Sequence, residues 1–201
     1  MVSPSNFCHV VFRTHHFDEM VDWYLNVLEA EASHRNDQYC FMTYDDEHHR
    51  VAIINLGPPP AGSDGRIAKG GPGVAHVAYS WRNIDELIHT YKRLKARGIL
   101  PVRPIRHGIT LSMYYDDPDG NNLEFQIDVL DADLANRYMQ TAGFAANPPG
   151  ELFDPEELIA RYQSGEPFDD LIFRSDQPEA KGRRFRRGGK ETLPVRSMAM
   201  A

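Results

Sequence analysis

The chain has 201 residues, of which 41% are hydrophobic and 25% charged, as in an ordinary globular domain. No apolar run approaches the roughly 20 residues that a membrane helix needs. The N-terminus also lacks the basic and apolar segments of a signal peptide, so we expect a cytoplasmic protein without membrane contact. Two cysteines, Cys8 and Cys40, are too few for a disulfide framework.

The net charge of −7 is unevenly distributed along the chain. Residues 181–201 hold seven Lys and Arg against one Glu, which gives +6 there and −13 in the remainder. The acidic body argues against a nucleic-acid groove on the folded part. Because the basic segment is rich in Gly and poor in apolar residues, we expect 175–201 to be a disordered tail. What this tail contacts stays open.

A repeat with an offset of 67 residues organises the first 130 residues. His9 matches His76 and Tyr24 matches Tyr91, which indicates two copies of one supersecondary unit. The predicted elements are strands at 7–14 and 73–80, helices at 18–30 and between Asn83 and Gly98, and extended segments at 38–44, 49–56, 99–102, 110–116 and 121–128. Each copy therefore has the order βαβββ, or one close to it.

The predicted fold class is α+β, with paired βαβββ modules and a helical C-terminal extension. The expected organisation is module one at 5–57, a Gly- and Pro-rich linker at 58–72, module two at 73–130, a helical arm at 131–174 and the basic tail. Within the arm, Asp154 followed by Pro155 is typical of a helix start. We expect the arm to cover a cavity mouth or a second subunit; a loosely docked tail is the alternative.

The last predicted strand carries Glu124 on its polar face, just beyond the Asp-Pro-Asp-Gly turn at 117–120. Taken alone, this pattern is also typical of a solvated strand face. The two matched His residues change that interpretation, because His9, His76 and Glu124 together make a two-His, one-carboxylate set. Such a set suits a non-haem Fe(II) with open coordination positions.

Duplicated βαβββ units with a His on each first strand and a Glu on the last strand resemble the vicinal oxygen chelate superfamily. The resemblance covers about residues 5–130. It implies one curved, partly closed mixed sheet around a metal site, with His9, His76 and Glu124 as the metal ligands.

Within that superfamily, three features resemble the catalytic half of type I extradiol catechol dioxygenases. They are the ligand spacings of 67 and 48 residues, the strand His48-His49-Arg50-Val51-Ala52-Ile53 and the segment Ser112-Met113-Tyr114. The resemblance implies an Fe(II) cofactor, an aromatic diol and O2 as substrates, and a role in aromatic hydrocarbon catabolism. It also implies that His49 is the catalytic acid/base and that Tyr114 hydrogen-bonds the bound diol. Ser112 and His107 are expected to contact substrate, although His107 lies two residues closer to Tyr114 than in the family pattern. We expect a homo-oligomer, a dimer or larger.

Two other functions of this fold remain open from the sequence. A fosfomycin-type thiol transferase uses the same ligand set with Mn2+ and potassium, but has no evident use for His49. A non-catalytic binding protein of the bleomycin-resistance type loses the metal, whereas this chain retains all three ligands. Glyoxalase I chemistry is disfavoured, because Ile53 stands where those relatives place a fourth ligand. The natural diol, and the choice between Fe and Mn, are left undecided.

Overall fold

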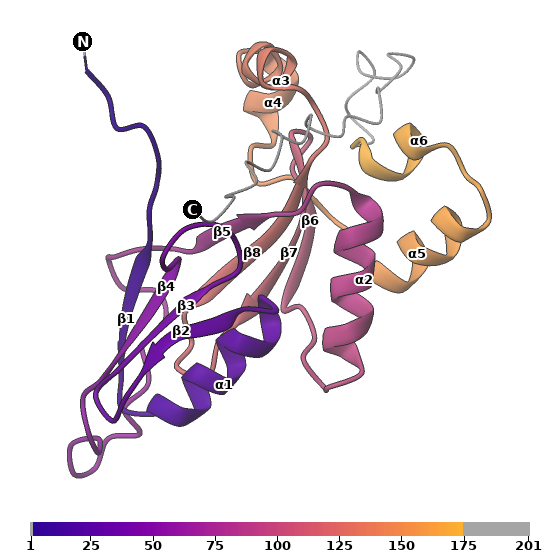
Figure 1. Ribbon diagram of the computed structural model, residues 1–201. Coiled ribbons are helices and arrows are strands. Elements are labelled where there is room, and N and C mark those ends of the chain that lie inside the picture. The colour runs from indigo at the N-terminus through magenta and orange to yellow at the C-terminus, as the bar shows by residue number, and fades with distance from the viewer. Residues whose placement is uncertain (1, 175–201) are drawn as a thin grey trace, which may run out of the picture. The chain divides into compact units, whose positions relative to one another are not determined.

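A computed structural model describes residues 2–174 (Figure 1). The expected basic tail, 175–201, therefore lies outside the described residues. The chain divides into two compact units. The first unit comprises residues 1–77, 97–99 and 115–123, and the second comprises 78–96, 100–114 and 124 onward.

The first unit contains one complete βαβββ module. Its elements are β1 (Val10–Thr14), α1 (Phe17–Val27), β2 (Glu31–Arg35), β3 (Tyr39–Thr43) and β4 (Val51–Asn55). They form a sheet in the order β1-β4-β3-β2. β1 and β4 are parallel, whereas β3 is antiparallel to both β4 and β2. Apolar residues of α1 recur at helical spacing, and Met20, Val21, Tyr24 and Val27 are fully buried.

The tip of the last hairpin, residues 115–123, also belongs to the first unit. Asp117 accepts backbone hydrogen bonds from Asp119 and Asn121, at 3.0 and 2.8 Å, which closes the expected turn. The Tyr24 hydroxyl donates to Asp117 at 3.0 Å, and His16 Nδ1 lies 2.6 Å from Asp119 Oδ1. These polar contacts tie the turn to α1 and to the residue before it.

The second module has the same element order as the first. It consists of β5 (Val77–Ser80), α2 (Ile84–Lys95), β6 (Arg103–Arg106), β7 (Thr110–Asp116) and β8 (Asn122–Asp128). Its strands follow the order β5-β8-β7-β6, which repeats the arrangement of the first sheet. The predicted α+β fold of two βαβββ modules is thereby confirmed. The strands lie in two open sheets, however, where the resemblance implied one partly closed sheet.

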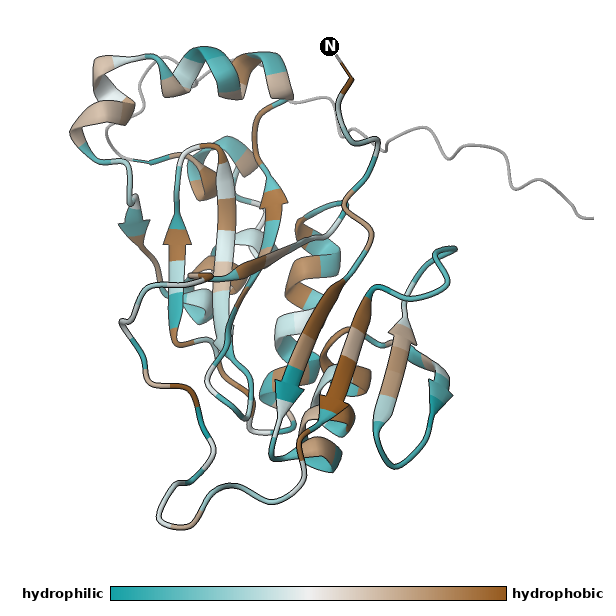
Figure 2. Cartoon of the chain, turned by 90° about the vertical axis from the view of Figure 1, so that its left-hand side faces the viewer, coloured by the Kyte–Doolittle hydropathy of each residue, from teal (hydrophilic) through white to brown (hydrophobic). Residues whose placement is uncertain are grey.

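The predicted strand positions were wrong at two places. β2 was missed, because its sequence Glu-Ala-Ser-His-Arg is exposed throughout and shows no apolar alternation. The segment 99–102 is not a strand, and the strand follows it as β6. Figure 2 shows hydrophobic residues concentrated on several of the strands. In β4, for example, four apolar residues follow one another.

The C-terminal arm is part of the second unit. It contains α3 (Ala132–Met139), α4 (Ala142–Ala146), β9 (Glu151–Leu152), α5 (Pro155–Gln163) and α6 (Phe168–Ile172). β9 pairs antiparallel with β6 and becomes the fifth strand of the second sheet. Glu156 of α5 accepts a hydrogen bond from Tyr91 of α2 at 2.6 Å and lies 2.5 Å from Lys95 Nζ. The arm is therefore docked through main-chain pairing and through side chains. Within 2–174, no helix has the length and apolar character to cross a membrane.

Candidate active site

A cavity of about 370 Å3 opens in the second unit, beside the polar face of β8. Three of the predicted site residues line it: His107, Tyr114 and Glu124. The other lining residues are Ile109, Thr110, Gln126, Asp128, Phe144 and Pro148. The cavity is thus bounded by β7, β8, the loop before β7 and the arm.

Glu124 reaches this cavity because β8 alternates strictly between two faces. Leu123 and Phe125 are fully buried, whereas Glu124 is only 6% exposed but lines the cavity. A buried carboxylate needs partners, and Glu124 has a hydrogen bond from Tyr114. His107 Nε2 lies 3.8 Å from Glu124 Oε1 and 3.0 Å from the Tyr114 hydroxyl. These three polar groups therefore converge on one point of the cavity wall.

Tyr114 is kept as a neutral phenol. Burial raises the pKa of its hydroxyl well above the ordinary value, and the hydrogen bond and charge of Glu124 raise it further. The guanidinium of Arg103, 4.6 Å from the ring centroid, opposes this shift without reversing it. Tyr114 consequently keeps its proton over the whole physiological pH range and, in this structure, donates it in a hydrogen bond to Glu124.

Ser112 lies on the same strand but is not among the cavity-lining residues. It is fully buried, and its hydroxyl donates to the Thr110 hydroxyl at 3.1 Å. Thr110 itself lines the cavity. Direct contact between Ser112 and substrate therefore remains a prediction, and Ser112 orients Thr110 in this structure.

His9 and His49 come together in the first unit. His9 immediately precedes β1, and its ring stacks on that of His49 with centroids 4.3 Å apart. Burial lowers the pKa of His49, and the neighbouring His9 and His48 lower it further, while Glu47 opposes them. The ring of His49 is thereby biased toward the neutral form, which can accept a proton.

His76 immediately precedes β5, just as His9 precedes β1, so the two His keep equivalent positions in the repeat. His9 and His76 belong to the first unit and Glu124 to the second. Over residues 2–174, no three His, Cys, Asp or Glu side chains are grouped closely enough to hold a metal ion. The metal-ligand set of His9, His76 and Glu124 accordingly stays a prediction.

Six lining residues were not among the predicted site residues: Ile109, Thr110, Gln126, Asp128, Phe144 and Pro148. Gln126 and Asp128 follow Glu124 at the two-residue period of β8, so the strand pattern contained the signal for both. Phe144 and Pro148 had no such signal. They reach the cavity only because the arm folds back against the sheet, which local sequence does not indicate.

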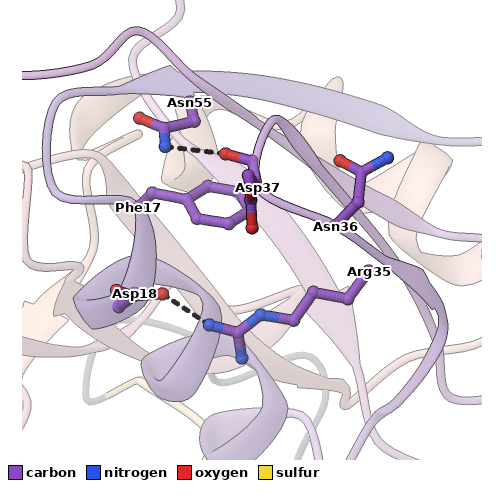
Figure 3. A pocket seen from close by; sticks show the side chains of 6 residues that line it. All are labelled: Phe17, Asp18, Arg35, Asn36, Asp37 and Asn55. Carbon is purple, nitrogen blue, oxygen red and sulfur yellow. Dashed lines mark hydrogen bonds and ion pairs between the residues drawn. The ribbon is translucent and has the colours of Figure 1, made fainter.

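A second hollow, of about 390 Å3, lies in the first unit and is shown in Figure 3. Three of its polar side chains are already engaged: Arg35 pairs with Asp18 at 2.5 Å, and Asn55 Nδ2 donates to the Asp37 carbonyl at 2.9 Å. None of the predicted site residues lines it. The cavity of the second unit and the His9–His49 pair of the first unit are therefore the two candidate functional features, each within its own unit.

Comparison with known proteins identifies the family. The model of the Glyoxalase/Bleomycin resistance protein/Dioxygenase superfamily matches residues 6–125. The chain belongs to this superfamily. The resemblance inferred from the repeat is confirmed, and the matched residues span both modules but stop before the arm.

Two curated relatives in the superfamily extend the likeness beyond the modules. Biphenyl-2,3-diol 1,2-dioxygenase 2 of Rhodococcus globerulus is 41% identical over 170 residues, which are 84% of this chain and 87% of the relative. Biphenyl-2,3-diol 1,2-dioxygenase 3 of the same organism is 36% identical over 87% of this chain and 91% of its own. These alignments are longer than the two modules, so they include part of the arm.

A solved structure supports the fold of the superfamily alone. A glyoxylase/bleomycin resistance protein/dioxygenase domain from Frankia sp. EAN1pec superposes with a TM-score of 0.51 at 19% identity, over 63% of this chain and 99% of that domain. The modules therefore have the superfamily architecture.

Proposed function

We propose that this protein is an Fe(II)-dependent extradiol dioxygenase, which opens the ring of a catechol-type diol with O2. The observation that carries the proposal is the identity of 41% and 36% to two biphenyl-2,3-diol 1,2-dioxygenases over most of each chain. The cavity adds chemical support, because a neutral phenol, an imidazole and a carboxylate converge there. Ring cleavage of a diol requires groups of these kinds.

The donor set proposed for the metal fits iron. Two imidazoles and one carboxylate, from His9, His76 and Glu124, satisfy the preference of non-haem Fe(II) and leave coordination positions open. Glu124 is nearly buried, and a cation would compensate its charge. When bound there, Fe(II) would hold the diol and O2 on one centre and supply the electron needed to activate O2.

His49 is proposed as the acid/base. With its pKa lowered by burial and by His9, the neutral ring can take the proton of a diol hydroxyl: the O–H bond breaks and an N–H bond forms. The same N–H can later return the proton to a reduced oxygen. The stacked contact with His9 would hold His49 beside a proposed metal ligand.

Tyr114 and His107 are proposed to orient the diol. The Tyr114 phenol would donate a hydrogen bond to a diol oxygen, and His107, 3.0 Å from that hydroxyl, would fix its direction. Because Tyr114 stays neutral, it adds no negative charge beside Glu124. The pair would therefore select the bound orientation of the ring without repelling the diolate.

The reaction class is tested by anaerobic purification, metal analysis and absorbance scans in air with catechol, 3-methylcatechol and 2,3-dihydroxybiphenyl. We expect stoichiometric iron and a yellow ring-opened product. Bound manganese without colour from any diol would favour the thiol transferase instead. Absence of both metal and colour would favour a binding protein of the same fold. A location in the cytoplasm and a homo-oligomeric state stay predictions.

Replacement of the proposed base gives a sharper test. His49→Gln is expected to lower kcat by about 10²–10⁴-fold, because the proton acceptor is lost while its neighbours remain. Iron content should be unchanged. His89→Gln is the matched control, since His89 is exposed on α2 and does not line the cavity, and this variant should keep near-normal activity. Full activity of His49→Gln would refute the role of His49.

A further inference from the structure

One wall of the cavity comes from the arm, beyond the residues that the superfamily model matches. That model ends at residue 125, whereas Phe144 and Pro148 line the same cavity as Glu124 and Tyr114. Phe144 is half-buried on α4, and its ring meets that of Tyr138 edge to face, with centroids 5.6 Å apart. An aromatic ring thus lines the same cavity as the polar groups, where it can pack on an apolar ligand.

We propose that Phe144 and Pro148 form the binding surface for an apolar, uncharged substituent of the diol and thereby set the preference for aryl-substituted catechols. This inference rests on the proposed function. The polar groups of β7 and β8 would take the two hydroxyls, and the arm would take the part of the substrate that plain catechol lacks. A cavity of about 370 Å3 is within the range that accommodates a small ligand.

The backbone around this wall is held in place on both sides of α4. Before the helix, the Thr141 hydroxyl donates to the Tyr138 carbonyl at 2.7 Å and accepts from the Phe144 amide at 3.2 Å. After it, Asn147 bonds Gly150 through its side chain, at 3.1 and 3.2 Å. The fully buried Arg174 donates to the Asn147 carbonyl at 2.6 Å. A wall fixed in this way is ordered before substrate arrives, which reduces the entropy lost on binding.

The charges at the cavity restrict the kind of substituent. Asp128 and Glu124 both line it, and Gln126 lies between them along β8. A substituent with a carboxylate would be repelled by Asp128, whereas an aryl group would contact Phe144 without meeting a like charge. The surface therefore favours neutral aromatic substituents over acidic ones.

The test compares two diols that differ only in the substituent. For 2,3-dihydroxybiphenyl, Phe144→Ala is expected to lower kcat/KM about tenfold, as the loss of an aromatic contact in a pocket typically does. For catechol the same variant should change kcat/KM by less than about twofold, because catechol does not reach the arm. Leu152→Ala is the control: Leu152 is 72% exposed on β9 of the same arm and does not line the cavity, so both diols should be processed normally.

Anaerobic calorimetry of 2,3-dihydroxybiphenyl binding gives a second readout that needs no turnover, and Phe144→Ala should weaken it by a similar factor. An equal loss for both diols, or no loss for either, would overturn the inference and leave the proposed function intact. If the wild-type protein binds the diol with an affinity that depends on Phe144 but does not cleave it, the proposed function is refuted, whereas the role of Phe144 in binding the substituent stands. If Phe144→Ala does not fold, Phe144→Leu and Pro148→Ala replace it. The deciding quantity is then again the ratio of kcat/KM for 2,3-dihydroxybiphenyl to kcat/KM for catechol.

Discussion

Tyr114 is held by three neighbours, and each restricts what its hydroxyl can do. Arg103 covers the ring, His107 bonds the hydroxyl, and Glu124 keeps it protonated. The phenol has one proton, which goes to Glu124 in this structure; donation to a ligand oxygen would follow when the proposed metal occupies the Glu124 carboxylate.

Tyr114→Phe removes this hydroxyl while the ring and its contact with Arg103 remain. We expect kcat/KM for a catechol to fall by about ten- to a hundredfold, as befits one hydrogen bond to a charged oxygen. Iron content and circular dichroism should be unchanged. Tyr162→Phe is the matched control, because its hydroxyl bonds Asp85 at 2.7 Å outside the cavity. Equal activity of both variants would contradict the role of Tyr114.

At the level of elements, Gly150 determines how closely the arm approaches β6. Its φ is +90°, and a Cβ there would lie 2.3 Å from the Arg106 carbonyl oxygen. Only glycine fits, since any side chain would push the chain away from the strand.

Gly150→Ala is therefore expected to destabilise the fold by more than the roughly 1 kcal/mol that a positive φ costs an alanine. Gly165→Ala separates the two effects, because Gly165 has a φ of +84° with nothing within 4 Å of its would-be Cβ. Thermal unfolding should show a lower Tm for Gly150→Ala than for Gly165→Ala. Identical values would mean that the loop moves away at no cost.

The helices and strands also show how much of the fold and of the site could be predicted from the sequence. The βαβββ repeat was predictable, because each module has its own apolar periodicity. The cap of α2 was also predictable, and Asn83 accepts from the Glu86 amide as expected. Glu124 could be singled out from the alternation of β8. β9 and the approach of α4 to the cavity could not, since they depend on contacts between residues far apart in the chain. The wall formed by Phe144 thus needed the structure.

For the molecule as a whole, the hydrogen bonds between α5 and α2 make the stability of the folded state depend on pH. Hydrogen bonds from Lys95 and then Tyr91 lower the pKa of Glu156 below its ordinary value. A carboxyl with a depressed pKa in the folded state stabilises that state when ionised. This contribution is complete above the ordinary pKa, about 4.5, and is lost as the pH falls through the lower folded-state value.

Glu156→Gln removes that contribution. The variant should have a lower Tm than the wild type between pH 6 and 8, and the gap should close as the pH falls below the ordinary pKa of this carboxyl, about 4.5. Thermal scans across this pH range measure the gap. Asp133→Asn is the matched control, because it removes one exposed carboxylate on α3 without touching Tyr91 or Lys95, and its Tm should stay close to that of the wild type. A gap that is constant at every pH would show that Glu156 acts through packing alone.

The placement of Phe144 outside the matched modules has a consequence for how such enzymes diversify. The proposed metal ligands and acid/base lie within residues 9–124, whereas the substituent wall lies at 144–148. Substitutions in the short segment 141–150 can then change the accepted diol while the chemistry is left alone. A library confined to positions 142–146, 148 and 149, which spares Thr141, Asn147 and Gly150, could be screened by the colour of ring-opened products and would explore new substrates at little risk to the fold or to catalysis. Natural relatives could acquire new substrates through substitutions in the same segment. Classifying them by substrate would therefore require comparing their C-terminal arms as well as their modules.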